Sequence, residues 1–168
     1  MIKKVLILGG GISKERSISL KTAKEVYKTL KKKRYKVAMC EPDGDLIIKI
    51  KKFKPDVVFN ALHGQFGEDG YIQAILESVK IRYTHSGVMA SSIAMDKEIS
   101  KKIYIKNKIL TPKYVKFNFL KSKKINKKLI SEINKKLKFP VVIKPINEGS
   151  SVHVYICNKK NFLKNLKK

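Results

Sequence analysis

The sequence predicts an α/β protein with a parallel sheet in its first part and a smaller α+β lobe in its second part. Over residues 1–96, short apolar runs alternate with longer segments in which apolar residues recur at helical spacing. This alternation is typical of parallel strands joined by right-handed helical crossovers. It stops near residue 96, so we expect the 168 residues, of which 43% are apolar, to form two small domains, 1–96 and 97–168.

The elements of the first domain follow from its apolar pattern. The unbroken apolar run Val5–Leu8 indicates a buried parallel strand. In Ser17–Lys33 the apolar residues fall on one helical face, which indicates a helix. By the same criteria we expect strands at Tyr35–Cys40, Asp56–Leu62 and Ile81–Thr84, and helices at Leu46–Phe53, Tyr71–Val79 and Val88–Met95.

The second domain begins with a predicted helix, Asp96–Lys108, and the pair Thr111-Pro112 then breaks the chain. Asn158 is a suitable N-cap for a last helix that runs to Lys168. Between these helices we expect a helix at Lys127–Leu137 and strands at Tyr114–Phe119, Val141–Lys144 and Ser151–Cys157.

The charge of the chain has two interpretations. A formal net charge of +26 is typical of proteins that bind nucleic acid. However, arginine occurs only at positions 16, 34 and 82, and nucleic-acid-binding proteins favour arginine for bidentate contacts. Lysine accompanies abundant isoleucine and asparagine here, which favours a general compositional bias. A basic nucleic-acid-binding protein remains the alternative, and it predicts binding that weakens steeply with salt.

The cysteines and the N-terminal residues indicate the cellular compartment of the protein. Cys40 and Cys157 are too few and too far apart for a disulfide framework or a zinc site, so we expect both to be small buried hydrophobic residues. The apolar run near Met1 is too short for a signal peptide, and no segment has the length needed to span a bilayer. We therefore expect a cytoplasmic protein without membrane contacts.

A glycine-rich turn joins the first predicted strand to the first predicted helix. Its sequence over residues 9–16 is GGGISKER. Such a turn at a helix N-terminus suits a bound phosphate or carboxylate. Within it, Glu15 suits the ammonium group of a substrate. The alternative is that Glu15 is an exposed charge that complements the helix dipole.

A second polar segment follows the apolar run at residues 57–59. Its sequence over residues 60–70 is NALHGQFGEDG, and it lies where open α/β sheets bind small molecules. His63 is either a ligand contact or a histidine that satisfies loop carbonyl groups. We interpret Glu68 and Asp69 as hydrogen-bonding residues that fix the loop.

A third segment combines a lysine with a glycine-serine loop. Lys144 ends an apolar run, and Gly149-Ser150-Ser151 follows shortly after it. A lysine charge together with backbone and hydroxyl donors suits the phosphates of a nucleotide. The alternative is an ordinary glycine-serine hairpin.

Five ordered segments together resemble the D-alanine–D-alanine ligases of the ATP-grasp superfamily. They are Gly10 to Arg16, Asn60 to Gly70, Ser86 to Ser91, Ala94 to Lys97, and Lys144-Pro145 with Glu148 to Val152. The resemblance spans almost the whole chain. It implies a Rossmann-like substrate domain that precedes an ATP-grasp domain at 1–96, and an incomplete N-terminal lobe of that ATP-grasp domain at 97–168.

The resemblance also implies a reaction and residue roles. Such ligases phosphorylate the carboxylate of one D-alanine with ATP, and the amine of a second D-alanine then attacks the acyl phosphate. By similarity, Glu15 would bind the ammonium of the first D-alanine, and His63 would line its pocket. Ser150 would orient this substrate through hydrogen bonds with Glu15, so Glu15 and Ser150 are the expected catalytic residues.

The nucleotide site is likewise implied by resemblance. Lys97 and Lys144 would contact the ATP phosphates, and Ser151 would lie in the loop that covers them. The Mg²⁺ ligands of the family belong to a later lobe, so we expect no metal ligand among these 168 residues. A homodimer through the first domain is also implied.

The chain departs from the family pattern at several positions. His85 stands where glycine is usual, His153 also replaces a usual glycine, and Gln65 replaces a common arginine. The segments that complete the adenine pocket and choose the second substrate are not found before Lys168. We therefore expect the isolated chain to be inactive, as a truncated ligase or a relic of one, and a D-alanine–D-lactate ligase stays open as an alternative.

Overall fold

The computed structural model describes residues 3–118, 127–149 and 152–166. These residues form two compact units. The first contains the described residues up to Asp96 together with residues 147–149, and the second contains Lys97–Ile146 and the described residues from 152 onward.

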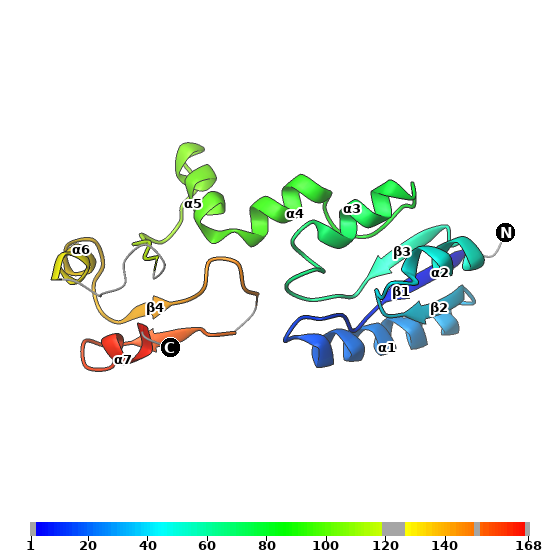
Figure 1. Cartoon of the computed structure of the whole chain (residues 1–168), viewed down its shortest axis with the longest axis horizontal. Helices are drawn as coiled ribbons and strands as arrows, with labels where there is room; N and C mark the ends of the chain where they lie inside the picture. The colour runs from blue at the N-terminus through cyan, green and yellow to red at the C-terminus, as the bar shows by residue number, and fades with distance from the viewer. Residues whose placement is uncertain (1–2, 119–126, 150–151, 167–168) are drawn as a thin grey trace. The chain divides into compact units, whose positions relative to one another are not determined.

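A three-stranded parallel sheet forms the centre of the first unit (Figure 1). Its strands are β1 (Lys4–Leu8), β2 (Lys36–Cys40) and β3 (Val57–Asn60), in the order β2-β1-β3. Leu8 pairs with Cys40 on one side and with Asn60 on the other. The three strands therefore end at the same edge of the sheet, and the loops that follow them leave from that edge.

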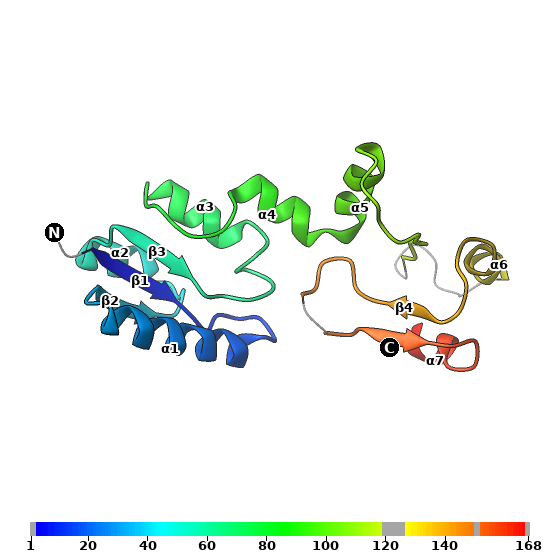
Figure 2. The same ribbon diagram turned by 180° about the vertical axis from the view of Figure 1, so that it is seen from behind.

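Helices pack on both faces of this sheet (Figures 1 and 2). They are α1 (Arg16–Lys32), α2 (Leu46–Phe53) and α3 (Tyr71–Ser78); α4 (Val88–Met95) follows and contacts α3. Because successive side chains of a strand point to opposite faces, β1 contributes to two cores. One core contains Val5, Ile7, Ala23 and Ala61, and the other contains Leu6, Leu8, Leu46, Ile50, Val58, Leu62, Ile72 and Leu76.

The strand expected at Ile81–Thr84 is shorter than predicted. Only an isolated parallel bridge joins Tyr83 to Val58, with hydrogen bonds from Val58 N to Arg82 O and from Thr84 N to Val58 O. The next donor of β3, Asn60 N, donates instead to the Thr84 hydroxyl at 3.0 Å. A side chain thus takes the place of the next backbone acceptor, and the ladder ends.

Tyr83 gives this segment a dependence on alkaline pH. Burial, together with the hydrogen bond that its hydroxyl donates to Glu77 at 2.6 Å, raises the pKa of Tyr83 to about 12. In an unfolded chain the pKa of tyrosine is about 10. Since the folded state favours the neutral phenol, its stabilising contribution is complete below about pH 10 and is lost between about pH 10 and 12.

We expect the stability difference between the native chain and Tyr83→Phe to shrink across this pH window. Urea unfolding of both proteins at several pH values measures it, and lysine titration, which is common to both, cancels in the difference. A difference that is constant from about pH 9 to pH 12 would contradict the assignment.

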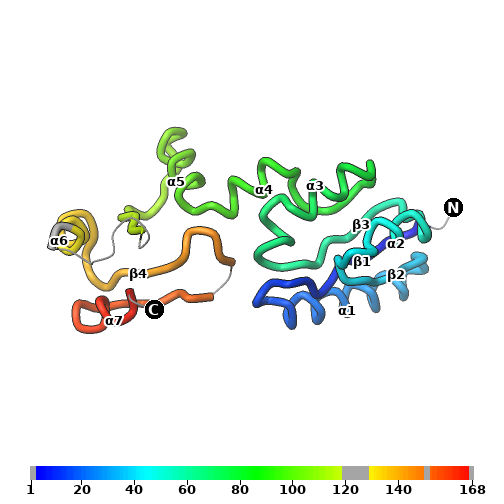
Figure 3. Tube along the Cα trace, in the orientation of Figure 1, coloured from blue at the N-terminus to red at the C-terminus, as the bar shows by residue number. Residues whose placement is uncertain are grey.

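The described part of the second unit contains a two-stranded antiparallel sheet and the helices α5, α6 and α7 (Figure 3). Its elements are α5 (Lys97–Lys106), α6 (Lys127–Lys136), β4 (Val141–Ile143), β5 (Tyr155–Cys157) and α7 (Phe162–Leu166). Its core is formed by Leu129, Ile133, Val141, Cys157 and Phe162. Asn158 caps the last helical segment as predicted, because its Oδ1 accepts from Lys160 N and Asn161 N.

The strand expected at Tyr114–Phe119 is wrong over its described residues. Residues 113–118 have no regular secondary structure, and residue 119 lies outside the described residues. Val115 and Phe117 pack against the core of the second unit. Both apolar side chains therefore cover a core although the segment is not a strand.

No helix in the described part of the chain is both long and apolar enough to cross a membrane.

Candidate functional site

A buried carboxylate lies at the sheet edge of the first unit. Glu15, at the start of α1, is 5% exposed. A Cβ added at Gly64 would lie 2.5 Å from its Oε2 atom, and one added at Gly149 would lie 2.7 Å from it. Among the described residues, none donates a hydrogen bond to this carboxylate. The interpretation of Glu15 as an exposed helix-end charge is therefore wrong.

The glycine-rich turn binds a carboxylate of the chain itself, that of Glu41. Gly11 N donates to Glu41 Oε2 at 3.2 Å, and Gly10 N donates to the Ser19 hydroxyl at 2.8 Å. The turn binds a carboxylate, as its sequence suggested, but that carboxylate belongs to the residue after β2.

His63 lies on the loop that follows β3. Its Nε2 atom is 3.2 Å from the hydroxyl of Thr22 on α1, and its Nδ1 atom is 3.8 Å from Glu68 Oε1. The other oxygen of Glu68 accepts from Gly64 N at 2.8 Å. The structure thus brings His63 into the same unit as Glu15, with Gly64 adjacent to both. Nothing in the sequence indicated a role for Thr22 in the site, since it lies on a helix far from the motif that contains His63.

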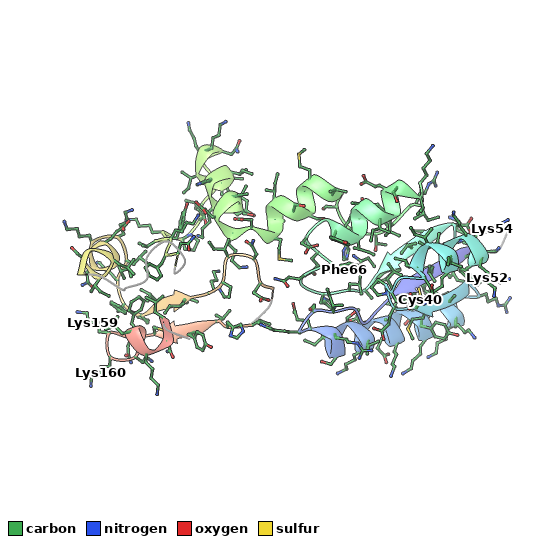
Figure 4. The ribbon with its side chains drawn as sticks, in the orientation of Figure 1. Cys40, Lys52, Lys54, Phe66, Lys159 and Lys160 are labelled. Atoms are coloured by element: carbon green, nitrogen blue, oxygen red, sulfur yellow. The ribbon has the colours of Figure 1, made fainter. Side chains whose placement is uncertain are left out.

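The acidic residues of this loop fix its backbone. Asp69 accepts from Phe66 N at 2.8 Å and from Tyr71 N at 3.1 Å, which caps the start of α3. The ring of Phe66 packs 4.6 Å from that of Tyr71 (Figure 4). The interpretation of Glu68 and Asp69 as loop-fixing hydrogen-bond acceptors is consistent with these contacts.

Two buried amides hold the middle of the same loop. The carbonyl oxygen of Gly67 accepts from Asn60 Nδ2 at 2.8 Å and from Gln73 Nε2 at 2.9 Å. Asn60 and Gln73 are 1% and 0% exposed. Sequence patterns did not identify Gln73 as part of the site, because a buried position on α3 looks like any other core position.

His85 occupies a backbone conformation that favours glycine. Its φ is +86°, and its Nδ1 atom is 3.1 Å from Asn60 Nδ2. This explains in physical terms why a glycine is the usual residue there. The imidazole provides a contact to the buried amide that a glycine lacks.

We expect His85→Gly to be more stable than His85→Ala by about 1 kcal/mol, because only alanine keeps the strain of a β-carbon at positive φ. Both variants lose the contact with Asn60, so that loss cancels in the comparison. Chemical denaturation of the two proteins measures the difference. Equal or reversed stabilities would show that the backbone at this position is not strained.

The predicted phosphate-binding lysines lie in the second unit. Lys97 donates from Nζ and from its backbone N to Ile146 O, each at 3.2 Å, so it binds the segment that follows Lys144. Lys101 donates to the Thr111 hydroxyl at 2.9 Å and to Pro112 O at 2.6 Å. Burial, and then the charge of Lys144, lower the pKa of Lys101. The expected residues Ser150 and Ser151 lie outside the described residues.

No group of three or more His, Cys, Asp or Glu side chains arranged to hold a metal was found among the described residues. Lys52 and Lys54 lie at the end of α2 in the first unit, and Lys159 and Lys160 lie in the turn before α7 in the second unit (Figure 4).

Comparison with known proteins identifies the family. Residues 46–86 match the family model for the D-ala D-ala ligase N-terminus, and residues 103–168 match that for the D-ala D-ala ligase C-terminus. A D-alanine–D-alanine ligase of Pelagibacter ubique (strain HTCC1062) is 73% identical over 167 residues, which are 99% of this chain and 54% of that protein. The chain belongs to the D-alanine–D-alanine ligase family.

Solved structures of the family agree with the fold. The crystal structure of the Bacillus anthracis D-alanine–D-alanine ligase has a TM-score of 0.81 and 35% identity, over 98% of this chain and 53% of that one. The same ligase complexed with ATP gives a TM-score of 0.79 and 32% identity, over 98% of this chain and 54% of that one. The chain thus spans about half the length of the family members that it matches.

Proposed function

We propose that residues 1–96 provide the site for the first D-alanine of a D-alanine–D-alanine ligase, and that residues 97–168 provide part of its ATP site. The observation that supports this most directly is Glu15, a buried carboxylate without a donor among the described residues. A largely buried carboxylate with no donor of its own is well suited to bind a cation. The ammonium of a small amino acid supplies that cation.

Two glycines lie close against the Glu15 carboxylate. Gly64 and Gly149 both approach the Glu15 carboxylate so closely that a methyl group at either would collide with it. His63, next to Gly64, is held by Thr22 and faces Glu68. In our proposal Glu15 binds the ammonium, His63 lines the pocket, and Ser150 helps to orient the substrate.

The lysines of the second unit fit the phosphoryl-transfer step. A carboxylate oxygen of the first D-alanine attacks the γ-phosphorus of ATP, and ADP leaves with the electron pair of the broken bond. The amine of the second D-alanine then attacks the carbonyl carbon of the acyl phosphate, and inorganic phosphate leaves. We propose that Lys97 and Lys144 offset the negative charge of the phosphates, and that Ser151 lies in the loop over them.

The family chemistry includes Mg²⁺. The described residues contain no cluster of side chains that would bind this ion, so no step of our proposal uses it.

We also propose that the reaction takes place in the cytoplasm, where ATP is available, and that the chain forms a homodimer through residues 1–96. Sedimentation of the purified chain tests the dimer.

Binding of D-alanine tests the proposal. We expect D-alanine to shift the ¹H–¹⁵N NMR signals of Gly64 and the neighbouring loop in the purified chain, while L-alanine at the same concentration leaves them in place. A second titration with ATP is expected to shift the signals around Lys97 and Lys144. Equal responses to D- and L-alanine, or none, would count against the D-alanine site.

A further inference from the structure

Glu41 holds one end of the segment that leads to Glu15. It is the first residue after β2, and Gly9 directly follows β1. Since Leu8 and Cys40 pair in register, and Gly9 N donates to Cys40 O at 3.1 Å, the two loops leave the sheet side by side. Gly11 N then donates to Glu41 Oε2 at 3.2 Å.

The same carboxylate holds the other end of the segment. Arg16, the residue after Glu15, donates from Nε to Glu41 Oε2 at 3.2 Å and from Nη2 to Oε1 at 2.5 Å. Bidentate arginine–carboxylate pairs fix geometry as well as charge. The Arg16 guanidinium, followed by the Gly11 amide, holds the pKa of Glu41 below its usual range, so the side chain is ionised when it makes these contacts.

The backbone of the turn lies against this carboxylate, whose side chain is 40% exposed. Gly10 has a φ of +90°, and a Cβ at this position would lie 2.3 Å from Glu41 Oε2 and 2.5 Å from its Cδ. Within the turn, Glu15 N donates to the Ser13 hydroxyl at 2.9 Å. The segment 10–16 is thus fixed at both ends by one side chain and in its middle by a serine.

We propose that Glu41 is a positioning residue that holds Glu15 in the orientation needed to bind an ammonium group. The backbone on both sides of Glu15 is held by Glu41, through the Gly11 amide before it and the Arg16 side chain after it. Glu41 also engages the guanidinium of Arg16, the residue that directly follows Glu15. This inference rests on the proposed function, because it assigns Glu41 to the site of the first D-alanine.

The test compares two amides on neighbouring positions. Glu41→Gln removes the charge and keeps the shape, whereas Asp43→Asn does the same on an acidic residue of this loop that binds Lys49. Circular dichroism first establishes that both variants are folded. We expect Glu41→Gln to weaken D-alanine binding about tenfold in an NMR titration, since a charge-assisted hydrogen bond contributes about this much, and Asp43→Asn to bind like the native chain.

A second variant and a second readout complete the test. Arg16→Gln is expected to weaken D-alanine binding as much as Glu41→Gln does. The double variant is expected to bind D-alanine no more weakly than either single variant, because all three disrupt the same ion pair between Arg16 and Glu41. Backbone amides of residues 13–16 are expected to exchange with solvent about tenfold faster in Glu41→Gln. Loss of overall stability alone would not produce this non-additive pattern in affinity among folded proteins.

The outcomes separate the two proposals. If the native chain binds D-alanine and Glu41→Gln binds it equally well, Glu41 does not position Glu15, and the proposed function stands. If the native chain does not bind D-alanine, the proposed function fails. In that case amide exchange still tests whether Glu41 holds the backbone of the turn. Unchanged exchange at residues 13–16 in Glu41→Gln would overturn that part of the inference.

Discussion

Replacing Glu15 with glutamine is expected to weaken D-alanine binding by about a hundredfold or more, because it removes the buried charge that faces the ammonium. The amide has nearly the same volume as the carboxylate, so the contacts with Gly64 and Gly149 stay possible. NMR or calorimetric titration with D-alanine measures the effect.

The matched control for this change is Glu25→Gln. Glu25 lies on the same helix, α1, but its side chain is exposed and pairs with Lys28 at 2.9 Å. We expect its D-alanine affinity to equal that of the native chain. If the two glutamine variants bind D-alanine alike, Glu15 is not the ammonium-binding group, and the central observation of the proposed function has another explanation.

The local signals in the sequence were sufficient for most elements of the fold. Helix α2 has the predicted bounds, Leu46–Phe53, because Asp43 accepts from Asp45 N before it and Lys54 takes a left-handed conformation ahead of Pro55. The two strand errors have a common origin. At Tyr83 and at Val115 the apolar pattern was correct, but whether a strand forms depended on a backbone partner that local sequence does not specify.

The site was predictable only where a motif lies within one segment. Glu15 and His63 each lie in a glycine-rich loop after a strand, and the parallel sheet brings those loops to one edge. Glu41, Thr22 and Gln73 support these loops from other elements. Their residue types are common on loops and helices, so their roles become visible only when the tertiary contacts are known.

The loop that contains His63 also depends on a glycine whose replacement is expected to be costly. A Cβ at Gly67 would lie 2.4 Å from the Cβ of Leu62, 3.0 Å from its carbonyl carbon and 3.2 Å from His63 N. Leu62 is 2% exposed, and its amide donates to Asn60 Oδ1 at 3.1 Å. The backbone that such a methyl group meets is therefore held on both sides and cannot move aside cheaply.

We expect Gly67→Ala to destabilise the first unit by about 2 kcal/mol, the usual cost of overpacking a rigid interior, which corresponds to a melting temperature about 8–16 °C lower. Gly44→Ala is the matched control, because a Cβ there meets no atom within 4 Å, and we expect it to be neutral or slightly stabilising. Thermal unfolding followed by circular dichroism compares the two variants.

The Gly67 carbonyl binds both Asn60 and Gln73, so a displaced loop would also move His63. D-alanine binding should therefore weaken in Gly67→Ala and not in Gly44→Ala. Equal melting temperatures for the two variants would mean that the loop can yield, and that its close packing does not fix His63.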